Sequence, residues 1–297
     1  MKNVLVIGGV SFNTLIYVDE FPKPQPHTTF SHHFHETVGS TGAGKAFNLH
    51  RLGVKATLHG VIGDDDYGHR LLTQFGQEGI PFIFDLDAQG TKRHVNLMDK
   101  HGRRISIFLY NGADKPELNW ELLETAVVQS DIVALNITAY GRLLIPLIKK
   151  HNKPIWCDIH DYDGRQPYHQ EFISAADVIH MSSDQMLDYR SFMESLIHQG
   201  KQFVICTHGK EGASALTAAG QWVETPILPD FDLVDSNGAG DAFFAGVLYG
   251  YLQGVDVETA VRYGAIASGY CITSLELASP ELNEARLLHT YETVYPV

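Results

Sequence analysis

Short apolar runs rich in β-branched residues alternate along the chain with longer stretches in which apolar positions recur every three or four residues. The short runs predict strands buried on both faces, at 4–7, 57–62, 132–135, 155–158, 178–180 and 203–207. The longer stretches predict helices, at 42–52, 66–78, 119–129, 141–151, 184–199 and 241–253. Strand–helix alternation of this kind favours an α/β fold with a mostly parallel sheet covered by helices on both faces.

Two segments, 14–38 and 91–109, have no helical period. The second predicts a hairpin, with strands at 93–98 and 103–109 and a turn between them. In the first, an extended strand would alternate Phe30, His32 and Phe34 with Ser31, His33 and His35 on its two faces. We expect these segments to form a small β lid over the carboxyl edge of the main sheet, inserted in a single domain spanning 1–297.

Composition and charge narrow the class of protein. The chain has 297 residues, of which 44% are hydrophobic and 19% charged, which is typical of a globular protein. Its net charge of −13 disfavours binding to nucleic acid or an anionic membrane. There is no apolar run of about 18 residues to span a membrane, and three widely spaced cysteines suggest neither disulfides nor zinc. We therefore expect a cytoplasmic protein.

The sharpest motif is Asp-Ser-Asn-Gly-Ala-Gly-Asp-Ala-Phe at 235–243, directly before helical sequence. Glycines allow a tight turn and close approach of the backbone to a ligand. The amides of 238–240 would then lie at a helix N-terminus, where unpaired N–H groups and the dipole favour an anion. Asp241, in the first turn, would be an ionised base beside that anion, as phosphoryl transfer to a hydroxyl requires. The alternative is an ordinary capped helix end without a ligand.

These residues resemble the C-terminal signature of the ribokinase-like, PfkB-type carbohydrate kinases. Further matches follow in family order at 39–53, 60–68 and 207–212. The resemblance implies a ribokinase-like three-layer α/β/α sandwich with a β lid, and ATP-dependent phosphorylation of a hydroxyl on a small sugar or polyol, with Mg²⁺. It also implies a homodimer formed through the lid.

The resemblance assigns roles to particular residues. Asp241 is the expected catalytic base, and Gly238, Ala239 and Gly240 supply the anion hole. The residues expected at the nucleotide are Thr207, Gly209, Gly212 and Asn237. The candidate acceptor-binding residues are Asn13, Gly42, Lys45 and Asn96.

The chain departs from the family pattern at several positions. Asn13 occupies the place of a usual Asp, Ser40 that of a second Gly, and Gly44 that of a usual Asn, next to Lys45. The family's Asn-x-x-Glu motif, which helps to organise Mg²⁺, is replaced by Ser182 and Gln185. These changes affect the acceptor side more than the phosphoryl donor side.

Other interpretations remain open. Residues 39–46 nearly match a P-loop, but Ala46 lacks the hydroxyl that Mg²⁺ needs. Four histidines at 27–35 would form a metal site or, in our preferred interpretation, a polar lid without metal. The polar segment 158–161 is either functional or an ordinary loop at a strand end. A nucleoside kinase using Phe12 and Phe34 for stacking, and a sugar- or nucleotide-binding sensor with weak catalysis, are the alternative functions.

Overall fold

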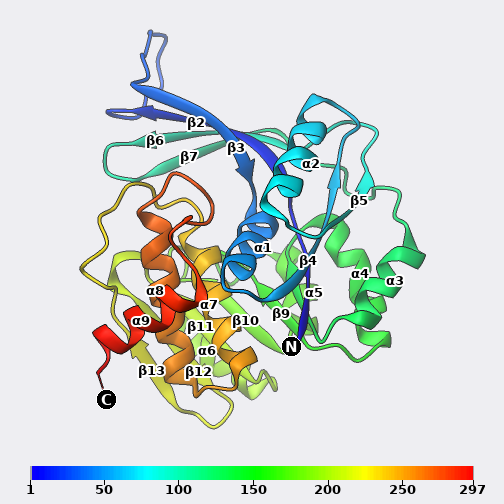
Figure 1. Cartoon of the computed structure of the whole chain (residues 1–297), viewed down its shortest axis with the longest axis vertical. Helices are drawn as coiled ribbons and strands as arrows, with labels where there is room; N and C mark the ends of the chain where they lie inside the picture. The colour runs from blue at the N-terminus through cyan, green and yellow to red at the C-terminus, as the bar shows by residue number, and fades with distance from the viewer. Residues whose placement is uncertain (1, 297) are drawn as a thin grey trace.

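The computed structural model describes residues 2–296, and its central feature is a nine-stranded sheet (Figure 1). In sheet order the strands are β13 (Trp222–Thr225), β12 (Ala213–Thr217), β11 (Phe203–Thr207), β10 (Val178–Ser182), β9 (Ile155–Asp158), β8 (Ile132–Asn136), β1 (Asn3–Ile7), β4 (Lys55–Ile62) and β5 (Phe82–Leu86). Neighbouring strands from β11 to β5 are parallel, and β12 and β13 add an antiparallel hairpin. The predicted parallel sheet is confirmed.

Helices cover both faces of this sheet, and each face has its own hydrophobic core. One face carries α1 (Thr41–Arg51), α2 (Asp66–Glu78), α7 (Ala239–Gln253), α8 (Val257–Ile272) and α9 (Glu284–Val294). The other carries α3 (Trp120–Gln129), α4 (Ala139–Lys150), α5 (Gln170–Ala175) and α6 (Tyr189–His198). The expected three-layer sandwich is therefore observed. Among the described residues, the helices lack the combination of length and apolarity that crossing a bilayer needs.

Local signals explain where helices begin. Asp65 caps α2 by accepting a hydrogen bond from the Gly68 amide, so this helix has its predicted bounds of 66–78. The predicted start of the next-to-last helix at 184 is wrong, because Asp188 caps α6 and the chain before it is a loop. Helices α8 and α9 were not predicted. Helix α8 is buried on several sides and rich in Ala and Gly, which removes the amphipathic pattern.

A second sheet forms the lid across one end of the molecule, away from both labelled termini (Figure 1). Its order is β3 (His33–Gly39), β2 (Ser11–Val18), β6 (Arg93–Asp99) and β7 (Arg104–Tyr110). The hairpin prediction corresponds to β6 and β7. The predicted strand is wrong at 30–32, because β2 pairs with β3 only from Tyr17 opposite His33 onward.

The two faces of the lid differ in chemistry. Odd-numbered residues of β2 share the inner face, where the Tyr17 hydroxyl donates a 2.7 Å hydrogen bond to Asp235. Arg104 of β7, on the same face, donates to the Asn237 side chain at 2.8 Å. The inner face therefore contacts the loop that precedes α7. The outer face is apolar and partly exposed, with Phe34, Ile105 and Ile107 among its side chains.

Candidate active site

The N-terminus of α7 presents backbone amides that no side chain caps. Gly238 is the N-cap residue and has φ 86°, a left-handed conformation that favours glycine. The Asn237 amide donates to Asp235 at 2.8 Å, which holds the loop. Within residues 2–296 the amides of Gly238 and Gly240 donate to no backbone carbonyl. A methyl group added to Gly240 would meet no heavy atom within 4 Å. This helix end is therefore open to an anion.

Asp241 lies in the first turn of α7, as predicted, and is only 8% exposed. The Lys45 Nζ of α1 lies 2.5 Å from Asp241 Oδ1 and 2.9 Å from Asp158 Oδ2. Lys45 is 1% exposed, so its ammonium is held almost entirely by the two carboxylates. No described residue donates a hydrogen bond to Asp241 Oδ2. One oxygen of this carboxylate is fixed, and the other is free to accept a proton.

Asp158, at the carboxyl end of β9, has cationic or hydrogen-bonding groups on both oxygens. The His180 Nδ1 of β10 lies 3.2 Å from its Oδ1, and the His160 Nδ1 lies 3.5 Å from its Oδ2. The His160 amide donates to Oδ1 at 3.0 Å. The His180 ring stacks on Phe243 of α7, with ring centroids 6.0 Å apart. Lys45, Asp158 and Asp241, with these two histidines, form what we call the ionic cluster.

Burial and neighbouring charges move the pKa values of this cluster in different directions. Burial raises the pKa of Asp241, and the negative charge of Asp158 adds to the rise while Lys45 opposes it. For Asp158, burial is outweighed by His160, Lys45 and His180, so its pKa falls well below the usual range. Burial alone would lower the pKa of Lys45, but the two carboxylates raise it to about 12. Lys45 and Asp158 are thus charged at neutral pH, and Asp241 binds a proton more readily than an ordinary aspartate.

Glycines let α1 approach this cluster closely. A Cβ on Gly44 would lie 2.5 Å from Asp241 Oδ2, so the missing side chain leaves room for that oxygen. A Cβ on Gly42 would lie 2.6 Å from the carbonyl carbon of Gly8, so this glycine allows α1 to pack on the loop after β1. The acceptor-binding role predicted for Gly42 stays a prediction.

The inner face of the lid carries buried polar atoms without partners. Asn13 of β2 pairs with His94 of β6, and Asn96 follows two residues later on the same face. Within the described chain, Oδ1 of Asn13 and of Asn96, Nε2 of His94 and Oγ of Ser11 have no hydrogen-bond partner. Buried polar atoms of this kind cost free energy unless a ligand or water pairs with them. These four residues, which we call the lid polar set, are suited to binding a ligand rich in hydroxyl groups.

Charges near the lid polar set are also shifted. Burial, together with Lys92 and Arg104, lowers the pKa of His94 to about 3, so its ring is neutral. Burial lowers the pKa of Lys92 to about 8. The His94 ring lies against Phe108, with centroids 4.0 Å apart. Neutral His94 can both donate and accept a hydrogen bond.

The residues expected at the nucleotide lie on two elements. Thr207 ends β11, and Gly209 and Gly212 flank the short turn that follows it. Gly212 has φ 96° and lies against the Thr225 carbonyl, where a side chain would not fit. Asn237 lies in the loop before α7. The carboxyl ends of β9, β10 and β11 are adjacent in the sheet, so the turn after Thr207 and the ionic cluster share one edge.

Sequence reasoning missed some members of the site. His180, Ser11 and His94 were not assigned roles, although a lone histidine within the apolar strand at 178–182 was a usable signal. Asp158 was recognised only as part of an ambiguous segment at a strand end. Among the histidines of the lid, His33 and His35 stack with Tyr17, and residues 2–296 contain no group of three or more His, Cys, Asp or Glu able to hold a metal.

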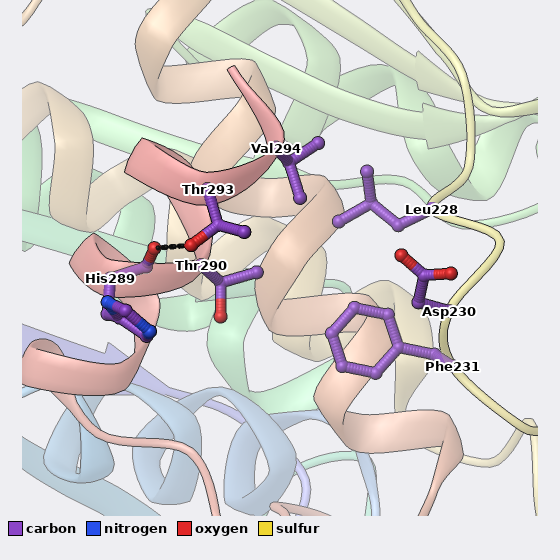
Figure 2. Close-up of a pocket in the computed structure, with 7 residues that line it drawn as sticks. All are labelled: Leu228, Asp230, Phe231, His289, Thr290, Thr293 and Val294. Carbon is purple, nitrogen blue, oxygen red and sulfur yellow. Dashed lines mark hydrogen bonds between the residues drawn. The ribbon is translucent and has the colours of Figure 1, made fainter. Parts of the chain in front are cut away.

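A separate surface pocket lies between α9 and the segment 228–231 (Figure 2). Figure 2 shows Thr293 donating its hydroxyl to the His289 carbonyl, with Phe231 on the facing loop. None of its lining residues belongs to the ionic cluster or the lid polar set. The candidate active site is therefore the edge of the main sheet beneath the lid.

Comparison with known proteins identifies relatives over nearly the whole chain. The model of the pfkB family carbohydrate kinases matches residues 1–284. Acarbose 7(IV)-phosphotransferase from an Actinoplanes species is 32% identical over 292 residues, covering 96% of this chain and 97% of that protein. The solved structure of the microbiome-derived acarbose kinase Mak1 superposes with a TM-score of 0.87 and 27% identity, covering 97% of this chain and 98% of that chain. Ribokinase from Giardia lamblia, at 18% identity, shares the fold, with a TM-score of 0.85 over 99% of both chains.

Proposed function

The chain belongs to the pfkB family of carbohydrate kinases and is thus an ATP-dependent phosphotransferase, and we propose that Asp241 is its catalytic base. The observation that carries this proposal is the free Oδ2 of a buried carboxylate, located in the first turn of an uncapped helix. A base and an anion hole on the same turn are what transfer to a hydroxyl requires.

The proposed reaction begins with the acceptor hydroxyl hydrogen-bonded to Asp241 Oδ2. As the hydroxyl oxygen bonds to the γ-phosphorus, its proton passes to Oδ2 and the bond to the β–γ bridging oxygen breaks, which releases ADP. The amides of Gly238, Ala239 and Gly240 stabilise the charge on the transferring group. Thr207, Gly209, Gly212 and Asn237 border the nucleotide.

Mg²⁺ accompanies the nucleotide in this proposal. Mg²⁺ keeps several waters and takes one or two protein carboxylates in addition to phosphate oxygens. Ser182 ends β10, and the exposed Asp184 follows it, so hydroxyl and carboxylate oxygens are present at the correct edge of the sheet. We assign Asp184 as a water-mediated ligand. Bound Mg²⁺ would neutralise charge on the β- and γ-phosphates.

The acceptor is a sugar held by the lid polar set. Asn13 and Asn96 were expected on the acceptor side, and their free oxygens, with His94 and Ser11, suit several hydroxyl groups. Lys45 lies beneath the acceptor, next to the base. Because the Actinoplanes relative is named for acarbose, acarbose and related oligosaccharides belong among the candidate acceptors.

The nucleoside alternative receives less support from the lid. Phe12 and Phe34 alternate to the face opposite Asn13, and the Phe12 ring packs on Tyr67 with centroids 5.8 Å apart. Phe34 is 63% exposed on the outer face. Neither ring is positioned on the inner face for stacking on a base, which favours a sugar.

The outer face of the lid supports a homodimer. Phe34, Ile105 and Ile107 are between 42% and 63% exposed on one sheet face. Exposed apolar surface of this kind marks interaction sites, and a second copy of the same face would bury it symmetrically. The use of ATP favours a cytoplasmic location.

The test is ADP release with ATP and Mg²⁺ over a panel of pentoses, hexoses, oligosaccharides including acarbose, and nucleosides. Asp241→Asn serves as the blank. We expect one class of sugar to raise the rate of the parent protein well above that blank. A response to nucleosides alone would overturn the sugar assignment, and an equal rate in the Asp241→Asn variant would overturn the assignment of the base.

A further inference from the structure

We propose that Lys45 is a positioning residue for Asp241 and that Lys45 and Asp158 act on this base with opposite signs of charge. The inference builds on the proposed function, because it assumes that Asp241 accepts the proton. Nothing in the family matches assigns this role to a lysine at the start of α1.

Geometry is the first argument. Lys45 Nζ lies 2.5 Å from Asp241 Oδ1, on the side of the carboxylate away from the free Oδ2. The same ammonium donates to Asp158 Oδ2 at 2.9 Å, so it cannot rotate away without breaking both bonds. The Phe244 ring lies 5.0 Å from Nζ and adds a cation–π contact. Lys45 therefore holds one edge of the base and leaves the other edge for the acceptor hydroxyl.

Space around the carboxylate gives a second argument. Gly44 precedes Lys45, and a Cβ there would lie 2.5 Å from Asp241 Oδ2. The pair Gly44–Lys45 thus does two things at adjacent positions of α1. Gly44 keeps the reactive oxygen free, and Lys45 binds the other oxygen.

Charge gives the third argument. The ionisable groups facing Asp241 are Lys45 on α1, Asp158 on β9, His160 after it, His180 on β10 and Cys271 on α8. A base with a free proton-accepting oxygen works only when ionised, so activity is present above its pKa and is lost as pH falls through it. Removing the positive charge of Lys45 should raise that pKa, whereas removing the negative charge of Asp158 should lower it.

The experiment is the pH profile of kcat/KM for the acceptor in four proteins. These are the parent, Lys45→Met, Asp158→Asn and the double variant Lys45→Met/Asp158→Asn. Methionine matches the length of lysine without charge, and asparagine matches the shape of aspartate. We expect Lys45→Met to move the acid limb up by about 1–3 pH units, the usual effect of losing a close opposite charge.

Asp158→Asn should move the acid limb to lower pH, and the double variant should lie between the single variants. At pH 7 we expect Lys45→Met to lose roughly 10- to 100-fold in kcat/KM, with most of the loss recovered above the shifted pKa. The KM for ATP should stay within about twofold. A purely structural role for Lys45 would reduce activity at all pH values and leave the limb in place.

Shifts of the same sign in both single variants, or no shift in either, would overturn the proposal. Thermal melting and ATP binding show whether each variant is folded. If Lys45→Met does not fold, the direction of the Asp158→Asn shift still decides, and the double variant, which removes both charges of the pair, gives a second measurement. The Asp241→Asn blank separates this proposal from the proposed function: if that variant keeps the parent rate, the base itself is wrongly assigned.

Discussion

The ionic cluster and the lid polar set are both buried, but their polar groups are satisfied very differently. In the ionic cluster, Lys45 has carboxylate partners at 2.5 and 2.9 Å within the chain. In the lid polar set, Asn13, Asn96 and His94 each keep an atom without a partner among residues 2–296. The comparison indicates that the base is preorganised by the folded chain, whereas acceptor recognition is completed only by the ligand.

The largest effect should come from removing the base at the centre of the ionic cluster. We expect Asp241→Asn to lower kcat by roughly 10²–10⁴-fold with nucleotide binding nearly unchanged, because a general base is lost while the anion hole remains. Single-turnover kinetics and ATP titration by calorimetry measure the two quantities. A parallel loss of ATP affinity would indicate a role in the nucleotide site instead.

A smaller disturbance of the same cluster is Gly44→Ala. The added methyl group would lie 2.5 Å from Asp241 Oδ2 and must displace that oxygen. A misplacement of about 1 Å at a reacting group costs roughly 10²-fold in rate, so we expect a fall of that size in kcat.

Gly76→Ala is the matched control for this variant. Gly76 lies in α2, and a methyl group there meets no heavy atom within 4 Å. It should leave kcat unchanged and raise the free energy of unfolding by about 0.5–1 kcal/mol, because alanine is favoured in helices. Equal kcat in the two variants would contradict the crowding at Oδ2.

The sequence predicted the scaffold and the base better than the contacts of the base. The motif at 235–243 placed Asp241 in the first turn of a helix, because glycines and helix signals act locally. Lys45 was expected on the acceptor side, and sequence could not show that its ammonium lies between Asp158 and Asp241. These residues are 113 and 196 positions away from Lys45, and only the packing of α1 against α7 and the sheet brings them together.

The same limit applies to the lid. Alternation correctly separates the faces of β6, because side chains in strands alternate with a period of two. The start of β3 at His33 depends on where β2 runs out of pairing partners, which is a tertiary property. The assignment of the whole chain as one domain with an inserted lid stays a prediction, as do the roles of the individual site residues.

The lid polar set predicts an intermediate effect that falls on binding. For Asn96→Ala, whose Oδ1 lacks a partner, we expect the acceptor KM to rise about tenfold, the value of one hydrogen bond to a hydroxyl group. The kcat and the KM for ATP should change less than twofold. The acceptor should also raise the Tm of the variant less than that of the parent.

Thr14→Ala is the control for Asn96→Ala. Thr14 lies on β2 with its side chain on the opposite face, where its hydroxyl is 3.4 Å from Glu36. It should leave the acceptor KM unchanged. If Thr14→Ala and Asn96→Ala raise KM equally, the lid acts through its general stability and the polar set is not the acceptor site.

The outer face of the lid provides the smallest expected effect on catalysis and a large one on assembly. Ile107 is 47% exposed beside Val95 of β6, and a lysine there would place a charge in the proposed dimer interface. We expect Ile107→Lys to be monomeric in sedimentation velocity at concentrations where the parent is a dimer, with kcat changed less than about threefold. Val128→Lys on α3, where the valine is 49% exposed far along the chain from the lid, should remain a dimer. If Ile107→Lys stays dimeric, the two copies associate elsewhere. If it becomes monomeric and also loses acceptor affinity, the inner face depends on the outer face being covered, and the separation between a preorganised base and a ligand-completed lid would extend to the subunit interface.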